Sequence, residues 1–490
     1  ALMAEDPELL GAARVAIGGG ASASAAIVAA GEEQAAILAA IDDEVLAARA
    51  ADVRDVAERI ARAIRGQSVA RLPGPSVAVA GDLPPSVTAE LDPALLQGIA
   101  LEAGSPTAHA AILARALGIP ATVGVTGLLD AVEGATEIGV VGDTGEVVVD
   151  PDGETTARLR RAMAAREEQR TADAALRTVP LATADGHRVT LLANVGRPEE
   201  SQAAADAGAE GIGLFRTEFL FMGRTSAPSI AAQAAAYAEA FAAFPGRPVV
   251  VRTLDIGGDK QLPYLRQEPE ENPFLGVRAI RLAAREPNRT LLVDQLRAIL
   301  AAAAQTTAEV WVMAPMVADL DDVALVRGLL EEAGGAGASV KVGIMVELPA
   351  AVLLADQLAA RVDFFSIGTN DLTQYTLAVD RTNAALAARQ DPMHPAVLRA
   401  IGTVVDAAKA RGIPVAVCGE MAGDPAGAVV LAGLGIDELS MDPRSFGPVK
   451  RAVGAVTRAQ ARVAAAEAAG STSAEEARRI IDALLRTNAD

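Results

Sequence analysis

Apolar residues recur at helical spacing in the first part of the chain. Between residues 42 and 66, Asp42 and Asp43 can cap a helix that Gly66 can end. One face of this segment carries an apolar stripe formed by Val53, Val56, Ile60 and Ile64. We therefore expect residues 1–66 to form a small helical unit.

The pattern changes to short apolar runs after residue 66. Prolines at 73, 75, 84 and 85 separate Val-rich runs, and residues 137–149 indicate two paired strands that turn at 142–145. A short helix that carries His109 lies between these groups. Residues 67–150 are thus predicted to form a small α/β domain.

The charged segment 151–177 has a helical pattern, which predicts a connecting helix within residues 151–180. Short apolar runs then alternate with helical segments, which indicates a (β/α)8 barrel over residues 181–455. The predicted strands are 189–195, 211–217, 249–254, 276–280, 310–316, 341–346, 364–367 and 415–418. Residues 456–490 are rich in Ala, Glu and Arg and are predicted to be helical. The fold class is therefore multidomain α/β.

Charge and composition exclude several functions. The net charge is -20 and only 3% of residues are aromatic, so nucleic acid is not an expected partner. The first twenty residues lack a signal-peptide pattern, and charged or polar residues interrupt the alanine-rich stretches, so we expect a cytoplasmic protein without membrane insertion. A single cysteine, Cys418, excludes an internal disulfide.

Polar residues follow the predicted barrel strands, where barrel enzymes build their active sites. Arg216, Arg252 and Arg381 lie after strands or before loops, and converging guanidinium groups would bind a phosphate. Taken singly, each arginine is more often a surface ion-pair partner.

Two carboxylates, Glu347 and Asp371, follow successive predicted strands and could share one Mg²⁺ with substrate oxygens, or could be an exposed loop pair. Cys418 ends the last predicted strand. Its thiol could protonate a carbon at the rim, although a cysteine in an apolar strand usually only packs.

His109 is predicted to stand in the first turn of its helix, after Gly104, Pro106 and Thr107. Unpaired N–H groups and the helix dipole would stabilise an anionic phosphoimidazole there. On spacing alone, a capping or core histidine is the more common explanation.

Several segments together resemble one family, the phosphoenolpyruvate-protein phosphotransferases (Enzyme I of the bacterial sugar phosphotransferase system). The resemblance extends over nearly the whole chain. The segments that carry it are 50–56 (AADVRDV), 104–120 around His109, 213–221 (GLFRTEFLF), 252–260 (RTLDIGGDK), 272–281 (NPFLGVRAIR) and 364–375 (FFSIGTNDLTQY).

This resemblance implies a role for each candidate residue. His109 would be the phosphorylated residue, and Cys418 the proton donor that yields pyruvate. Phosphoenolpyruvate would be bound by Arg216, Arg252, Asn370, Asp371 and Arg381, and Mg²⁺ by Glu347 and Asp371. The implied architecture is a helical subdomain that docks the phosphocarrier protein HPr (1–66), a swivelling phosphohistidine domain (67–150) and a barrel that binds phosphoenolpyruvate and forms a homodimer.

The chain departs from the family pattern in two places. Ala108 stands where the family usually has a serine before the histidine, which removes one hydroxyl. The chain is also expected to be shortened at its N-terminus, with partial helical and phosphohistidine domains. A phosphoenolpyruvate-binding dimer that transfers nothing to HPr is therefore an alternative. A dikinase or phosphoenolpyruvate synthase relative fits less well, because only 108 residues precede His109.

Overall fold

A computed structural model describes residues 6–40, 44–66, 72–88, 90–104, 109–258, 262, 264–265, 268, 270–283, 285, 288–335 and 340–488. The chain divides into two compact units, residues 1–166 and 167–490. The boundary falls within the long helix α7 (Gly153–Ala175), in the segment predicted to connect two domains.

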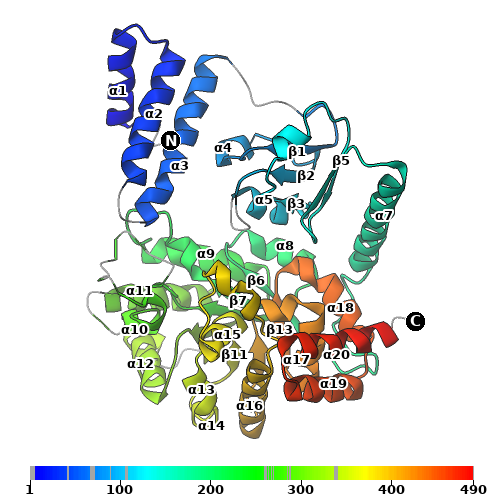
Figure 1. Ribbon diagram of the computed structural model, residues 1–490. Helices are drawn as coiled ribbons and strands as arrows, with labels where there is room; N and C mark the ends of the chain where they lie inside the picture. The colour runs from blue at the N-terminus through cyan, green and yellow to red at the C-terminus, as the bar shows by residue number, and fades with distance from the viewer. Residues whose placement is uncertain are drawn as a thin grey trace. The chain divides into compact units, whose positions relative to one another are not determined.

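Unit 1 begins with three helices that lie side by side, α1 (Pro7–Gly18), α2 (Ala23–Ala39) and α3 (Glu44–Ile64) (Figure 1). The helix predicted over 42–66 is α3, whereas its predicted caps, Asp42 and Asp43, lie outside the described residues. A Cβ at Gly31 would lie 2.4 Å from Cβ of Ala57, so the absence of a side chain lets α2 and α3 approach closely.

The rest of unit 1 is a small α/β fold. The parallel strands β1 (Ser76–Ala80), β2 (Leu96–Leu101) and β3 (Ala121–Thr122) form one sheet, and the predicted hairpin is the antiparallel pair β4 (Ile138–Val141) and β5 (Glu146–Val149). Helix α5 (His109–Leu117) buries Ala110 and Ala114 against Leu96 and Ile99. Two short helices, α4 (Pro85–Thr88) and α6 (Leu128–Ala131), complete the described part.

Unit 2 is a closed barrel of eight parallel strands in chain order, which confirms the predicted fold class. Its strands are β6 (Thr190–Val195), β7 (Ile212–Arg216), β8 (Pro248–Arg252), β9 (Glu309–Ala314), β10 (Lys341–Val346), β11 (Phe365–Ile367), β12 (Val415–Val417) and β13 (Glu438–Met441). The interior of the barrel is filled by the side chains of Leu214, Val250, Trp311, Met313, Met345, Phe364 and Cys418.

One predicted strand is wrong. Residues 276–280 do not form a strand; they follow the 3₁₀ turn η3 (Pro273–Leu275) and run into the helix α10 (Ile280–Ala283). The eighth strand is instead β13, which pairs with β12 and β6 and closes the barrel. The apolar run at 276–280 is short enough to suit either a strand or the start of a helix. It also contains a buried arginine, Arg278, which binds the carboxylates of Asp255 and Asp371.

Helices cover the outside of the barrel (Figure 1). They include α8 (Glu200–Asp206), α9 (Ile230–Ala242), α11 (Asn288–Ala303), α12 (Leu320–Leu330), α13 (Pro349–Leu353), α14 (Ala355–Leu358), α15 (Thr369–Leu377), α16 (Pro395–Arg411), α17 (Pro425–Leu434), α18 (Phe446–Gly454), α19 (Arg458–Gly470) and α20 (Ala474–Thr487). In the parts of the chain that are described, none of the helices combines the length and apolar character needed to cross a membrane.

The end of α7 is fastened to the barrel by α18. Lys450 donates hydrogen bonds from Nζ to the carbonyl oxygens of Leu176 and Arg177, both at 3.0 Å, and Arg451 forms an ion pair with Asp173. The Lys450 side chain is buried, so these backbone acceptors replace water around its charge. The connecting helix therefore has a fixed attachment within unit 2.

Candidate active site

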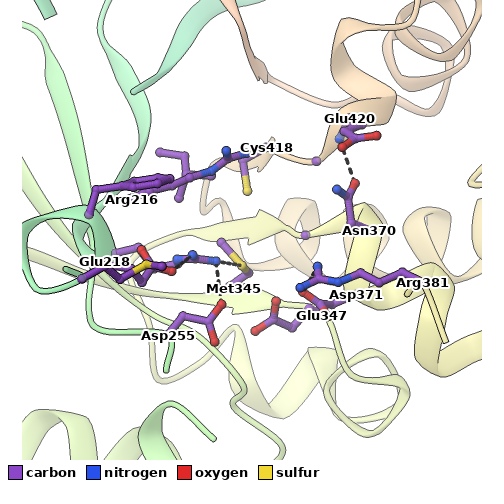
Figure 2. Close-up of a pocket in the computed structure, with 16 residues that line it drawn as sticks. Arg216, Glu218, Asp255, Met345, Glu347, Asn370, Asp371, Arg381, Cys418 and Glu420 are labelled. Carbon is purple, nitrogen blue, oxygen red and sulfur yellow. Dashed lines mark hydrogen bonds and ion pairs between the residues drawn. The ribbon is translucent and has the colours of Figure 1, made fainter. Parts of the chain in front are cut away.

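A cavity of about 310 Å³ opens at the carboxyl ends of the barrel strands. All seven barrel residues predicted as site residues line it: Arg216, Arg252, Glu347, Asn370, Asp371, Arg381 and Cys418. Figure 2 shows Arg216 and Cys418 near one wall of the cavity, with Asp255, Glu347 and Asp371 along the opposite side. The barrel thus brings together residues that lie up to 202 positions apart in sequence, from Arg216 to Cys418.

The strands explain this convergence. Arg216 and Arg252 are the last residues of β7 and β8, Glu347 follows β10, and Cys418 follows β12. Asp371 lies in the first turn of α15, directly after β11. Because all eight strands are parallel, their carboxyl ends meet on one rim.

Arg252 is buried among carboxylates. Its Nη2 forms an ion pair with Glu218, and its Nη1 lies 3.2 Å from Oδ2 of Asp255 and 3.7 Å from the sulfur of Met345. Burial lowers the pKa of this guanidinium, but the charges of Glu218 and Asp255 outweigh that effect and raise it. Arg252 therefore stays positively charged in the cavity wall.

Arg278 lies behind the cavity and is 1% exposed. Its guanidinium donates from Nε and Nη2 to the two oxygens of Asp255 at 2.8 and 3.0 Å, and from Nη1 and Nη2 to those of Asp371 at 3.1 and 3.3 Å. A planar guanidinium that binds two carboxylates fixes the orientation of both. Arg381 reaches Asp371 from the cavity side through a longer ion pair of 3.5 Å.

Glu347 is a buried carboxyl group in an acidic environment. Its Oε1 accepts a hydrogen bond of 2.6 Å from the backbone N–H of Met316, which adopts a positive φ of 58°. Burial, followed by the charges of Asp371 and Asp255, raises the pKa of Glu347 to about 8. A cation placed between these carboxylates would offset the part of this pKa increase that comes from their repulsion.

Cys418 is 2% exposed and contributes its side chain to the cavity wall. Burial raises the pKa of its thiol, so the thiol keeps its proton near neutral pH. A protonated thiol can serve as an acid but not as a nucleophile. The next turn is held by Asn370, whose Oδ1 accepts a hydrogen bond of 2.9 Å from the N–H of Glu420 (Figure 2).

The donor chemistry of Glu347 and Asp371 fits a hard divalent cation, because both groups offer carboxylate oxygens. Within the described residues, no group of three or more His, Cys, Asp or Glu side chains is arranged to hold a metal ion. Mg²⁺ is commonly held by one or two carboxylates, with substrate oxygens and water completing its shell. The two carboxylates are sufficient for a site of that kind.

His109 belongs to unit 1 and begins helix α5, as the sequence predicted. Its side chain, and residues 105–108 before it, lie outside the described residues.

Three residues that shape the site had no predicted role. Glu218 and Asp255 occur in the sequence analysis only within the segments 213–221 and 252–260, and Arg278 lies in a segment predicted to be a strand. A charged residue within an apolar run was the signal that could have identified Arg278, since a buried arginine needs carboxylate partners.

Family models match three parts of the chain. Residues 170–458 match the phosphoenolpyruvate-binding domain of PEP-utilising enzymes, residues 72–145 match their mobile domain, and residues 1–49 match their N-terminal domain.

Individual relatives agree with these family models. A phosphoenolpyruvate-protein phosphotransferase from Streptomyces coelicolor is 45% identical, and the match covers 99% of this chain and 86% of that protein. One from Bacillus subtilis is 41% identical over 86% of this chain and 75% of its own length. A multiphosphoryl transfer protein from Rhodobacter capsulatus is 45% identical over 96% of this chain. The matched region spans only 57% of that last relative's length.

Proposed function

Because this chain belongs to the phosphoenolpyruvate-protein phosphotransferase family of PEP-utilising enzymes, we propose that it transfers the phosphoryl group of phosphoenolpyruvate to its own His109 and then to HPr. Pyruvate is the other product. In this role the chain catalyses the first step of sugar uptake by the phosphotransferase system.

The observation that carries this proposal is the charge arrangement of the cavity. Arg216, Arg252 and Arg381 line one small space together with the carboxylates Glu347 and Asp371. Arginines bind the phosphate and carboxylate oxygens of a small dianionic substrate, while the carboxylates face a divalent cation. Arg381 has the longest of the ion pairs to Asp371, so we expect it to turn towards the phosphate when substrate binds.

The chemistry balances without a further reactant. A ring nitrogen of His109 forms a bond to phosphorus as the bond between phosphorus and the enol oxygen breaks. The electron pair of that bond leaves with the oxygen and generates the enolate of pyruvate. Cys418 then gives its thiol proton to C3, and solvent restores the thiol. Arginine charges stabilise the transferring group without becoming covalently involved.

Mg²⁺ is the proposed cofactor, held by Glu347 and Asp371. It would neutralise charge on the substrate oxygens during transfer. Asp371 would bind it in an orientation already set by Arg278, and Glu347 would bind it as the carboxylate, with the loss of its proton.

Partners and a location are also part of the proposal. We propose that residues 1–66 contact HPr, that the barrel forms a homodimer, and that the protein works in the cytoplasm. The domain that carries His109 must alternate between the barrel and HPr, and the segment 151–180 would connect it to the barrel.

Phosphoryl transfer from ³²P-labelled phosphoenolpyruvate tests the proposal. The purified chain is incubated with Mg²⁺, with and without HPr, beside His109→Ala. We expect acid-labile label on the unaltered chain, none on the variant, and transfer of the label to HPr. Tight phosphoenolpyruvate binding without label would instead support the alternative of a binding protein that transfers nothing.

A further inference from the structure

Two side chains from other strands hold the backbone of Cys418, which lines the cavity. Asn194 on β6 donates from Nδ2 to the carbonyl oxygen of Cys418 at 3.0 Å. Ser440 on β13 donates from Oγ to Oδ1 of Asn194 at 2.6 Å. The chain of contacts runs through the barrel from β13 to β6 and on to the end of β12.

The hydrogen bond from Asn194 to the Cys418 carbonyl takes the place of a hydrogen bond between neighbouring strands. The pairing of β12 with β13 ends at Val417, so the carbonyl of Cys418 leaves the barrel ladder. A buried carbonyl needs a donor, and the Asn194 amide provides it. The orientation of the amide is determined, because a carbonyl can only accept, which places Nδ2 at Cys418 and leaves Oδ1 for the Ser440 hydroxyl.

The fold makes room for the pair on its other side. A Cβ at Gly213 on β7 would lie 2.4 Å from Oγ of Ser440 and 2.5 Å from its Cβ. Position 213 must therefore be glycine for β7 to pack this closely against Ser440. Ser440 is fully buried. Ser440 is therefore closely packed, while Asn194, which it orients, is partly buried.

We propose that Asn194 and Ser440 are positioning residues for the acid step: they set where the Cys418 thiol meets C3, so that the proton is delivered to one face of the enolate. This inference rests on the proposed function, in which Cys418 is the proton donor. Neither residue belongs to the cavity lining, and their hydrogen bonds connect them to it through Cys418.

Phosphoryl transfer and protonation of C3 can be measured separately. A positioning role of Asn194 and Ser440 would affect only the protonation, whereas a general structural role would affect both. Phosphoryl transfer to His109 depends on the arginines and the carboxylates of the cavity. Proton delivery to C3 depends on the thiol. A misplaced thiol would leave phosphorylation intact and release the enol to be protonated by water on either face.

The test uses phosphoenolpyruvate that carries one deuterium at C3 in the Z position. A single turnover with the full chain and Mg²⁺ is run in tritiated water, and lactate dehydrogenase with NADH traps the pyruvate at once. The configuration of the labelled methyl group reports the face of protonation, and ³²P label on His109 is measured in parallel.

Two variants test the role of Asn194 and Ser440. Asn194→Asp keeps the size of the side chain but places a carboxylate oxygen against the Cys418 carbonyl, and Ser440→Ala removes the hydroxyl that orients the amide. We expect both to label His109 at close to the unaltered rate while the excess of one methyl configuration is lost. Ser201→Ala, which removes another buried hydroxyl on α8, is the matched control and should keep that excess.

Each outcome is decisive. Retention of one configuration in both Asn194→Asp and Ser440→Ala overturns the positioning role. A racemic methyl group from the unaltered chain, or an unchanged configuration from Cys418→Ala, overturns Cys418 as the donor and the inference with it. Absence of label on His109 in the unaltered chain overturns the proposed function itself.

Discussion

Arg278 binds both oxygens of Asp371, with Nη1 and Nη2 at 3.1 and 3.3 Å from them. The same guanidinium binds both oxygens of Asp255, which also pairs with Arg252. An arginine proposed to bind phosphate and a proposed metal ligand are thus connected through one buried cation. Their positions depend on a residue that lies outside the cavity lining.

Replacement of Arg278 by lysine tests this connection. Lysine keeps the charge but cannot bind two carboxylates through a planar fork, so Asp371 would lose its fixed orientation. We expect the Mg²⁺ concentration for half-maximal pyruvate release to rise about 10–100-fold, as for loss of other outer-shell partners. Arg297→Lys on α11, whose exposed pair with Asp294 is remote from the cavity lining, should leave the Mg²⁺ dependence unchanged. An unchanged dependence in Arg278→Lys would show that the carboxylates hold their positions without it.

The sequence located most of the barrel because its strands are apolar and short, and because polar residues follow them. It missed β13 (Glu438–Met441), in which Glu438 and Ser440 interrupt the apolar pattern. Both side chains are buried in the barrel interior. An alternating polar and apolar pattern in the sequence does not show whether the polar side chains face such an interior or solvent.

The sequence could predict those site residues that lie directly at the end of a predicted strand. Arg216 and Cys418 needed nothing more than the end of a strand. The roles of Arg278 and Asn194 arise from contacts with residues 93 and 224 positions away, Asp371 and Cys418. No local pattern records such pairings, so these residues required the structure.

Two glycine substitutions should have opposite effects on stability. A Cβ at Gly419 would lie 2.0 Å from Oγ1 of Thr369 and 2.7 Å from its backbone nitrogen, so Gly419→Ala must displace the turn after Cys418. Gly402 lies inside α16, and a Cβ there meets only an atom of Leu434 at 4.0 Å. We expect Gly402→Ala to raise the free energy of unfolding by up to about 1 kcal/mol. Gly419→Ala should lower it and slow pyruvate release.

Urea denaturation of both variants, with pyruvate release measured on the same samples, provides the comparison. Equal activities in the two variants would contradict the close fit between Gly419 and Thr369.

A buried glutamine supports the ends of β7 and β8. Gln295 donates from Nε2 to Oγ1 of Thr217 at 2.9 Å and accepts at Oε1 from the N–H of Leu254 at 3.0 Å. Thr217 in turn donates to the carbonyl oxygen of Arg252 at 2.9 Å. Gln295→Leu would leave these groups without their partner, at a cost of about 1–3 kcal/mol in the free energy of unfolding.

We also expect weaker phosphoenolpyruvate binding by Gln295→Leu, because the backbone of Arg252 would lose its support. Urea denaturation gives the first quantity and isothermal titration with phosphoenolpyruvate and Mg²⁺ gives the second. Gln305→Ala, in the exposed turn that follows the same helix, is the control. A stable Gln295→Leu protein with unaltered affinity would exclude this supporting role.

At the opposite end of the barrel, β13 begins with Glu438. This side chain is 9% exposed, and burial, followed by the charge of Asp437, raises its pKa to about 7. Glu210 and Glu309 act in the same direction, and Lys341 acts against them. At pH 4 the carboxyl group is largely protonated in the folded and unfolded chains alike.

As the pH rises from 4.5 to 7, the unfolded chain loses this proton while the folded chain keeps it, so the free energy of unfolding falls. The loss approaches about 3 kcal/mol and is complete above pH 7, because 2.5 pH units correspond to that energy. Glu438→Gln cannot lose a proton. We therefore expect it to be more stable than the unaltered chain at pH 8, with the difference shrinking towards pH 4. Urea denaturation at pH 4, 6 and 8 measures this, and Glu475→Gln, at an exposed position on α20, is the control. A difference between Glu438→Gln and the unaltered chain that stays constant with pH would mean that Glu438 is ionised in the folded barrel.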